Sequence, residues 1–312
     1  MKGILRKLAV MLVTVLVVSF LVFLAFDVIP GDPAQAKLGT QATPEAVEAL
    51  REEMGLNRPF LVRYGEWVSG LARGDLGTSY SYSMSVSQMI GEKIPITLTM
   101  MGFSFLMMVV FSVLLGIYTA RHAGGWLDRI ILIVNQIVMA VPPFFSGILI
   151  SLVLGLILKW FTPGGNISWK ENMGRFLWYM AFPSVAIALP KCAMAVKLLR
   201  SSLLEELKKE YIRTALSRGN SMRSALYFHA LKNAMMPVLT FWGMALADML
   251  AGSIIVEQVF SIPGIGRILL TSISNRDYPV VEAIIVLIAV WVVLINTLVD
   301  VIYRVIDPRI QE

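Results

Sequence analysis

Cysteine, histidine and charged side chains are all scarce in this chain of 312 residues. It has one cysteine, Cys192, and two histidines, and charged residues make up 15% of the sequence, where a soluble domain carries about 25%. A single cysteine excludes an intrachain disulfide. The low charge, together with an apolar share of 57%, indicates a membrane protein rather than a soluble domain.

Motifs for nucleotide binding and catalysis are also missing. The sequence has no G-x-x-x-x-G-K-[ST] loop, no H-E-x-x-H and no G-x-S-x-G. His122 and His229 fall in or beside segments that connect apolar runs, away from any buried serine nucleophile. The Gly264-Ile265-Gly266 run is too short for a dinucleotide fingerprint and predicts a turn. We expect no enzyme activity, no metal site and no cofactor in this chain.

Long apolar runs are what the sequence has in abundance. A helix needs about 20 apolar residues to cross a membrane, and six segments meet that length: 8–29, 97–119, 131–158, 176–199, 236–256 and 280–303. They predict an all-α polytopic membrane protein with six transmembrane helices. The first run could instead be a cleaved signal peptide, but its apolar core is long and no clean small-x-small site follows. We interpret it as a retained span.

Lysine and arginine set the expected orientation. With the N-terminus inside, the inner segments hold the larger share of the basic residues, and most of the outer ones lie in a long acid-balanced loop. Both termini are therefore expected to be cytoplasmic. The net charge of +6 reflects this bias and does not indicate nucleic acid as a partner.

The predicted organisation has four parts. These are a first transmembrane helix (1–29), an extracytoplasmic helical loop (30–95), a membrane core (96–303) that includes a cytoplasmic loop (200–235), and a cytoplasmic tail (304–312). In the outer loop, Thr43 and Pro44 predict the start of one helix and Gly55 its end, and a second helix is expected after Pro59. A folded-back turn is expected over 257–279.

The cytoplasmic loop has a helix-turn-helix pattern. Leu204, Leu207, Tyr211 and Ala215 recur at helical spacing and predict one face of a helix. Gly219 and Asn220 predict a left-handed stop, and Ser221 can cap the next helix, which runs toward Pro237. Its excess of basic residues is explained by topology alone, but the paired helices and the stop are not.

The residues of this loop carry a resemblance. Glu210-Tyr211-Ile212-Arg213-Thr214-Ala215 with Gly219, and then His229-Ala230-Leu231-Lys232-Asn233-Ala234, resemble the "EAA" coupling loop of ABC importer permeases, in particular the dipeptide/oligopeptide/nickel permease family. Other parts of the chain resemble that family in order: Pro30-Gly31-Asp32-Pro33, Gly74-Asp75-Leu76-Gly77, Pro263-Gly264-Ile265-Gly266-Arg267, Arg276-Asp277-Tyr278-Pro279 and Asp307-Pro308-Arg309.

The resemblance implies a type I ABC importer permease fold in a bacterial or archaeal cytoplasmic membrane. It implies a second homologous permease subunit, two ATP-binding subunits that hold ATP and Mg, an extracytoplasmic substrate-binding protein and membrane lipid as partners. It also implies that a short helix of the loop docks on an ATPase subunit. The coupling residues would be Leu207, Glu210, Tyr211, Arg213, Thr214, Ala215 and Gly219, supported by His229 and Asn233.

Two charged residues fall inside predicted spans. Lys191 and Asp248 could face a transport pathway or pair with each other, because charges at membrane depth are costly and often functional. The expected substrates are dipeptides or oligopeptides, with nickel or a metal chelate as the alternative. An ion-coupled secondary transporter is the alternative from another class, and it would be supported by broken, symmetry-related helices and several intramembrane carboxylates.

Overall fold

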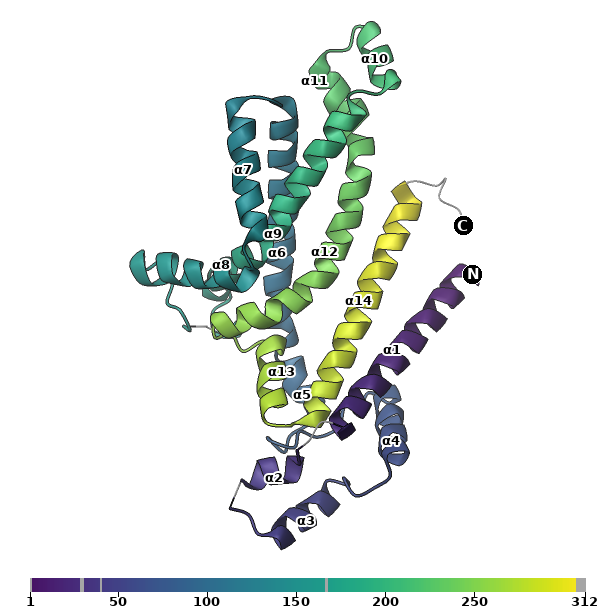
Figure 1. The fold of residues 1–312 in the computed structure, drawn as a ribbon, viewed down its shortest axis with the longest axis vertical. Coiled ribbons are helices and arrows are strands. Elements are labelled where there is room, and N and C mark those ends of the chain that lie inside the picture. The colour runs from purple at the N-terminus through teal and green to yellow at the C-terminus, as the bar shows by residue number, and fades with distance from the viewer. Residues whose placement is uncertain (1, 29–30, 40, 166–167, 307–312) are drawn as a thin grey trace. The chain divides into compact units, whose positions relative to one another are not determined.

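The computed structural model describes residues 2–28, 31–39, 41–165 and 168–306. In these ranges the secondary structure is helical, apart from one isolated bridge between Thr78 and Ser85 (Figure 1). The chain forms two compact units. The first holds the residues up to Thr97 and Pro263–Thr297, and the second holds Leu98–Ile262 and the residues from Leu298 onward. Pro30 and the predicted tail residues 307–312 lie outside the described ranges.

The first unit combines a long helix at each end of the chain with short helices. Its elements are α1 (Lys2–Val28), α2 (Pro33–Leu38), α3 (Pro44–Glu53), α4 (Phe60–Ala72), α5 (Val86–Gly91), the first turn of α6 (Ile94–Arg121), α13 (Ile265–Ser274) and most of α14 (Tyr278–Ile306).

The second unit holds the rest of α6 and the middle of the chain. Its other elements are α7 (Trp126–Ala140), α8 (Pro143–Ile150), the π-helical η1 (Ser151–Ile157), α9 (Met173–Glu206), α10 (Glu210–Ser217), α11 (Met222–Ser224), the π-helical η2 (Ala225–Ala230), α12 (Leu231–Val259) and the end of α14. Helix α9 packs against α12, α7 and α8, so it is the central helix of this unit.

Among the described residues, five helices are long and apolar enough to cross a membrane, and a bent pair makes a sixth. The prediction of several apolar membrane-spanning helices is confirmed. The predicted span 131–158 is not one continuous helix, because α7 and the helix made of α8 and η1 meet at 104°. Val141 is extended, with ψ 121°, as a residue before proline prefers. Pro142 and Pro143 follow it, so the helix cannot continue.

The two helices predicted between the first spans are confirmed. The Thr43 side chain accepts a hydrogen bond from the backbone N–H of Ala46 at 3.3 Å at the start of α3, and Gly55 has a positive φ of 69° after its end. Helix α4 packs on α1 through aromatic rings. Phe23 lies 5.5 Å from Tyr64 and 6.3 Å from Trp67, measured between ring centroids. This segment is therefore a folded layer on the end of the first span.

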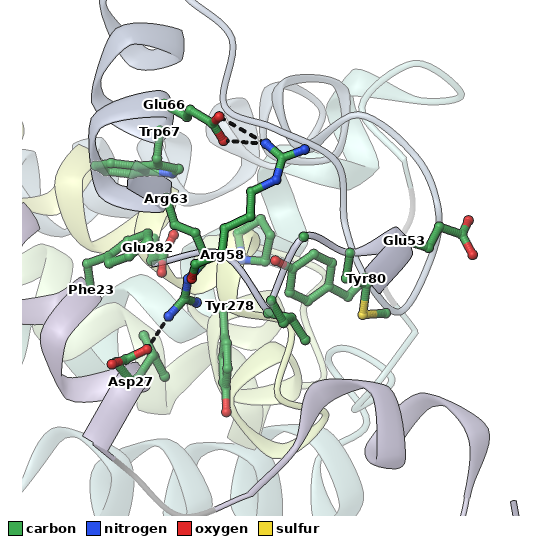
Figure 2. Close-up of a pocket in the computed structure, with 15 residues that line it drawn as sticks. Phe23, Asp27, Glu53, Arg58, Arg63, Glu66, Trp67, Tyr80, Tyr278 and Glu282 are labelled. Atoms are coloured by element: carbon green, nitrogen blue, oxygen red, sulfur yellow. Dashed lines mark hydrogen bonds and ion pairs between the residues drawn. The ribbon is translucent and has the colours of Figure 1, made fainter. Parts of the chain in front are cut away.

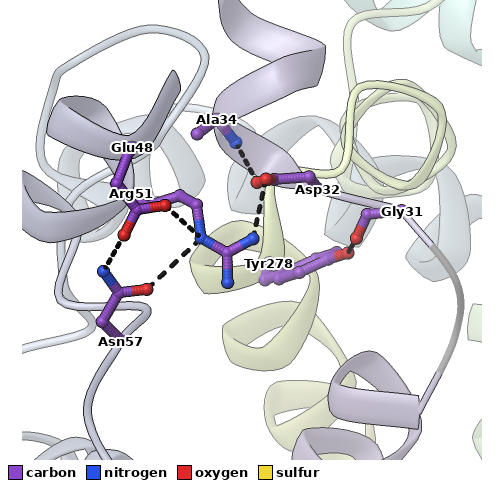
Figure 3. Close-up of polar contacts among 7 residues, drawn as sticks. All are labelled: Gly31, Asp32, Ala34, Glu48, Arg51, Asn57 and Tyr278. Carbon is purple, nitrogen blue, oxygen red and sulfur yellow. Dashed lines mark hydrogen bonds and ion pairs between the residues drawn. The ribbon is translucent and has the colours of Figure 1, made fainter. Parts of the chain in front are cut away.

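Asp32 links the start of α2 to α3 (Figure 3). One carboxylate oxygen accepts from the backbone N–H of Ala34 at 2.9 Å and caps α2. The other accepts from Arg51 of α3 at 2.9 Å. Asn57 accepts from Arg51 at 3.3 Å and donates to Glu48 at 2.7 Å. The aspartate therefore orients the helices that follow the first span.

The segment 257–279 contains a helix where a turn was expected. Gly264 precedes α13, and the backbone N–H of Ile265 donates to the Thr97 hydroxyl at 3.0 Å. At the end of this segment Asp277 is fully buried. Its carboxylate accepts from the Tyr80 backbone N–H at 2.8 Å and from the hydroxyl of Ser79. Asp277 thereby fixes a loop that lies almost 200 residues earlier in the sequence.

Candidate functional site

The helical segment after α9 differs from the single amphipathic helix that the sequence predicted. Helix α9 ends at Glu206, and α10 begins at Glu210, so Leu204 and Tyr211 are not on one continuous helix. The Glu206 carboxylate accepts hydrogen bonds of 2.6 Å from Lys209 and from the Tyr211 hydroxyl. These bonds lie across the break and hold the chain in its new direction.

Helix α10 has a buried face and an exposed face. Ile212 is fully buried and Ala215 is 7% exposed, whereas the side chains of Glu210 and Arg213 are 82% and 70% exposed and form an ion pair of 2.8 Å. Thr214 is also exposed. These three exposed residues lie on one side of α10, and that side is free to contact another molecule.

The buried face of α10 packs into the core at the ends of the long helices. This core joins α6, α9, α10, η2 and α12 through buried side chains, and Leu207 packs against it: Ala120, Leu199, Leu203, Ile212, Ala225, Leu226, Ala230, Ala234 and Val238. Close packing of this kind transmits a displacement, because protein interiors have few voids. A force on α10 therefore reaches two long helices directly.

The predicted stop after α10 is confirmed. Gly219 has a φ of 89°, a left-handed value that residues with a Cβ rarely adopt. The Asn220 side chain donates to the carbonyl of Ala215 at 3.1 Å. Ser221 then caps the next helix by accepting from the backbone N–H of Ser224 at 3.2 Å.

A polar network connects the two sides of the loop. Asn233 of α12 donates to the Tyr211 hydroxyl at 3.1 Å, and that hydroxyl donates to Glu206. Burial, followed by the hydrogen bond to Glu206, raises the pKa of Tyr211 above its ordinary value. The hydrogen bond to Glu206 also raises the pKa of Lys209. His229 is exposed and lies outside this network.

Lys191 and Asp248 form an ion pair between α9 and α12. Both also line a cavity of about 520 Å³ in the second unit, together with Val141, Pro142 and Pro143 from the α7–α8 bend. The two alternatives for these residues, pairing with each other and facing an open space, are therefore compatible, since a pair can line a cavity. Non-helical backbone inside a span is tolerated where it lines a cavity, and Val141, Pro142 and Pro143 of the bend line this one.

One buried ion pair was missed by the sequence analysis. Arg200 of α9 donates from Nε to Asp128 at 2.8 Å and from a terminal nitrogen to the other carboxylate oxygen at 2.7 Å. Asp128 is 1% exposed and also accepts from the backbone N–H of Gly124 at 2.9 Å. This pair fixes the start of α7 against α9. An aspartate in the first turn of a helix was the available signal, but no spacing in the sequence indicates that Arg200 is its partner.

Several apolar spans, a bend that lines a cavity with a charged pair, and a short amphipathic helix packed on the spans define a multi-pass membrane transport component. Comparison with known proteins identifies the family. Residues 112–312 match the model for the inner membrane component of binding-protein-dependent transport systems, and residues 1–101 match the model for the N-terminal part of such components. The chain belongs to this family of ABC importer permeases and has its type I fold.

Individual relatives are similar over nearly the whole chain. A probable peptide ABC transporter permease protein of Sinorhizobium fredii is 35% identical, covering 99% of this chain and 98% of the relative. A dipeptide transport system permease protein of Alkalihalophilus pseudofirmus is 32% identical, with 98% of each chain covered. A glutathione transport system permease protein of Salmonella choleraesuis is 33% identical, with 99% and 98% covered. The chain is a multi-pass inner membrane permease subunit of an ABC uptake transporter.

Proposed function

We propose that this permease subunit carries short peptides inward and is driven through α10 by a separate ATPase subunit. The observation that carries the proposal is the pair of opposite faces on α10. Ile212 is part of the core of the long helices and Ala215 is buried beside it on the helix, while Glu210, Arg213 and Thr214 remain exposed. A rigid attachment with a free polar face is what a docking helix requires.

The orientation and the partners belong to the same proposal. Both termini and the loop 200–235 face the cytoplasm, where two ATP-binding subunits hold ATP and Mg. A second homologous permease supplies the other half of the pathway, and an extracytoplasmic binding protein delivers the substrate. The excess of lysine and arginine in the segments on that side supports this orientation. ATP hydrolysis is assigned to the partner subunits because this sequence has no phosphate-binding loop.

Docking of a motor on α10 would move the long helices as rigid bodies. Leu207 packs at the break before α10, Gly219 ends the helix, and Asn233 ties it to α12 through Tyr211. These residues would keep the helix stiff while Glu210, Arg213 and Thr214 contact the partner. His229 is exposed one turn before Asn233 and would contact the same partner.

Lys191 and Asp248 would face the pathway. The cavity that they line is bounded by the bend of α7 and α8, and their side chains are 27% and 59% exposed. A paired lysine and aspartate present both charge signs to a zwitterionic peptide. The printed names of the relatives, which are peptide, dipeptide and glutathione permeases, support peptides over nickel. Uptake of a radiolabelled dipeptide and of ⁶³Ni²⁺ by cells with and without the subunit distinguishes these substrates.

Site-directed crosslinking tests the docking proposal. Arg213→Cys, made in a Cys192→Ala background, should crosslink to an ATP-binding subunit in membranes of the assembled transporter. The control is Lys170→Cys, because Lys170 is exposed and lies in the segment expected on the opposite side. The proposal fails if position 213 gives no crosslink to a nucleotide-hydrolysing subunit, or if position 170 gives the same product.

A further inference from the structure

A second cavity is lined entirely by residues of the first unit. Its volume is about 360 Å³, within the range of small-molecule sites. The walls come from the end of α1, the loop after α3, helix α4, Tyr80 and the start of α14 (Figure 2). The cavity therefore joins segments from both ends of the sequence.

Glu282 is the unusual residue of this cavity. It lines the wall from the first turns of α14 and is 5% exposed. Within the described part of the chain, its carboxylate forms no hydrogen bond and no ion pair, and Arg63 acts on it only through its charge. A buried carboxylate without a partner is costly, so it needs a positive group or a proton from outside the chain.

The basic residues of the cavity are already engaged. Arg63 forms an ion pair with Asp27, and Arg58 forms one with Glu66 at 2.9 Å. In Figure 2, Glu282 and the Arg63–Asp27 pair lie on one side of the pocket and Tyr80 on the other. These pairs leave two carboxylates of the lining without a cation, Glu53 and Glu282. Glu53 is exposed to solvent, so Glu282 is the buried one.

Aromatic rings form much of the remaining wall. Phe23, Phe26, Trp67, Tyr80 and Tyr278 line the cavity, and the guanidinium of Arg63 already lies 5.7 Å from the centroid of Phe23. Burial, and then the charge of Glu282, raises the pKa of Tyr80 to about 12, so its hydroxyl stays neutral at pH 7. Aromatic faces attract cations, and these rings can enclose the apolar body of an organic amine.

We infer that this cavity binds the ammonium group of an organic amine, with Glu282 as its counter-ion and the aromatic rings around its apolar part. The carboxylate would accept the N–H groups of the ligand, which supplies the partner that the chain lacks. Such charge-assisted hydrogen bonds are the strong ones in a water-poor site. The inference does not depend on the proposed transport function, because the cavity lies wholly in the first unit.

An ammonium group has two natural sources here, a dissolved amine or the ethanolamine headgroup of a lipid. Phenethylammonium is a suitable probe, because it joins one ammonium to one ring. Its neutral counterpart, 2-phenylethanol, has nearly the same shape. Both are titrated by calorimetry into the full-length chain, with the subunits that purify with it, in nanodiscs of phosphatidylglycerol.

The amine should bind saturably and the alcohol should not. Glu282→Gln keeps the shape of the side chain and should weaken amine binding at least tenfold. Glu52→Gln is the matched control, because Glu52 is an exposed carboxylate of α3 that does not line the cavity. It should bind the amine as the unsubstituted chain does.

The lipid source is tested by repeating the titration with phosphatidylethanolamine in the discs. Weaker apparent binding of the amine there identifies the headgroup as the competing ligand, and unchanged binding identifies a dissolved amine. The inference is overturned by an absence of saturable amine binding, by equal binding of the alcohol, or by a folded Glu282→Gln chain that binds as before. If that variant does not fold, the amine–alcohol comparison on the unsubstituted chain decides.

Discussion

The hydroxyl of Tyr211 donates a hydrogen bond of 2.6 Å to the carboxylate of Glu206, across the break between α9 and α10. Glu206 is 9% exposed, so its charge depends on the donors around it. Asn233 extends the bond to α12 by donating to the same hydroxyl at 3.1 Å. One phenol therefore connects α10 to both of the long helices on which it sits.

Tyr211→Phe should loosen the loop without unfolding the protein. The variant removes one hydrogen bond to a buried carboxylate, and because Tyr211 is 37% exposed water can replace part of it. We expect a cost of about 1 kcal/mol, which corresponds to a roughly fivefold larger open population. Trypsin cleavage after Lys208 and Lys209 should become faster by about that factor.

Tyr227→Phe is the control for this change. Tyr227 is half-buried in η2, and within the described residues its hydroxyl has no hydrogen-bond partner. Its cleavage rate at the same bonds should match that of the unsubstituted protein. If Tyr211→Phe is also cleaved at the original rate, the bond to Glu206 does not hold the loop.

Gly219→Val should abolish most uptake while the protein still inserts. No atom lies within 4 Å of a Cβ built at this position, so the cost comes from the left-handed backbone alone. That strain is about 1–2 kcal/mol, and about 1.4 kcal/mol is tenfold in an equilibrium. Uptake of the labelled dipeptide should fall to roughly a tenth or less, with unchanged abundance in the membrane fraction.

Two further variants separate backbone strain from side-chain size. Gly219→Asn should retain uptake, because asparagine tolerates the left-handed region. Gly65→Val should also retain it, since Gly65 has equally open surroundings but no positive φ. Normal uptake in Gly219→Val would remove the stop from the coupling mechanism.

Local sequence chemistry predicted the parts of the structure that depend on neighbouring residues. The cap at Thr43, the left-handed turn at Gly219 and the cap at Ser221 are all found where they were expected. Each is decided within four or five residues by a side chain that bonds the nearby backbone or by a backbone that only glycine adopts easily. The apolar runs predicted the spans for a similar reason, since their length alone matches the membrane.

Features that depend on distant partners were not predicted. The bend at Val141 was missed because an apolar run was counted by hydropathy, although Pro142 and Pro143 were a readable signal. The break before α10 depends on the bond from the Tyr211 hydroxyl to Glu206. That hydroxyl is in turn held by Asn233, which comes from another helix. Arg200 and Asp128, 72 residues apart, and the cavity around Glu282 depend on the fold as a whole. The spacing of residues in one sequence does not predict which distant side chains will meet in the fold.

Asp248→Asn should lower the amount of assembled transporter. The change leaves Lys191 charged without its partner, and an unpaired charge at membrane depth costs about 2.5–3.5 kcal/mol on insertion scales. A loss of 1–2 kcal/mol already changes abundance several-fold. Abundance is measured by quantitative immunoblot of the membrane fraction, with Lys197→Gln, on α9 like Lys191, as the control. An unchanged amount of complex would show that the ion pair adds nothing to assembly.

Exchanging the two charges tests the pathway assignment. Lys191→Asp combined with Asp248→Lys keeps an ion pair and should restore abundance. If the pair faces the substrate, dipeptide uptake stays impaired because the charges have changed places. Full recovery of uptake in this double variant would show that the pair is structural and would remove both residues from the pathway.

Arg200→Ala should destabilise the second unit more than any change at its surface. Asp128 is 1% exposed and would keep only the N–H of Gly124 as a donor. Breaking a buried pair on one side costs ~3–5 kcal/mol, and the remaining bond favours the lower end. A loss of ~3 kcal/mol lowers the unfolding midpoint by roughly 6–12 °C in a unit of this size, which scanning fluorimetry can measure.

The unfolding midpoint of Arg200→Lys should lie between those of Arg200→Ala and the unsubstituted protein. Lysine keeps the charge but cannot form the two parallel bonds of the guanidinium. Arg129→Ala is the control: Arg129 is exposed beside Asp128 in the sequence and should shift the midpoint little. The Arg200–Asp128 pair joins the start of α7 to α9. Its loss should therefore loosen α7, which leads into the bend that lines the Lys191–Asp248 cavity. Equal shifts for Arg129→Ala and Arg200→Ala would mean that general surface charge, and not this pair, stabilises the unit.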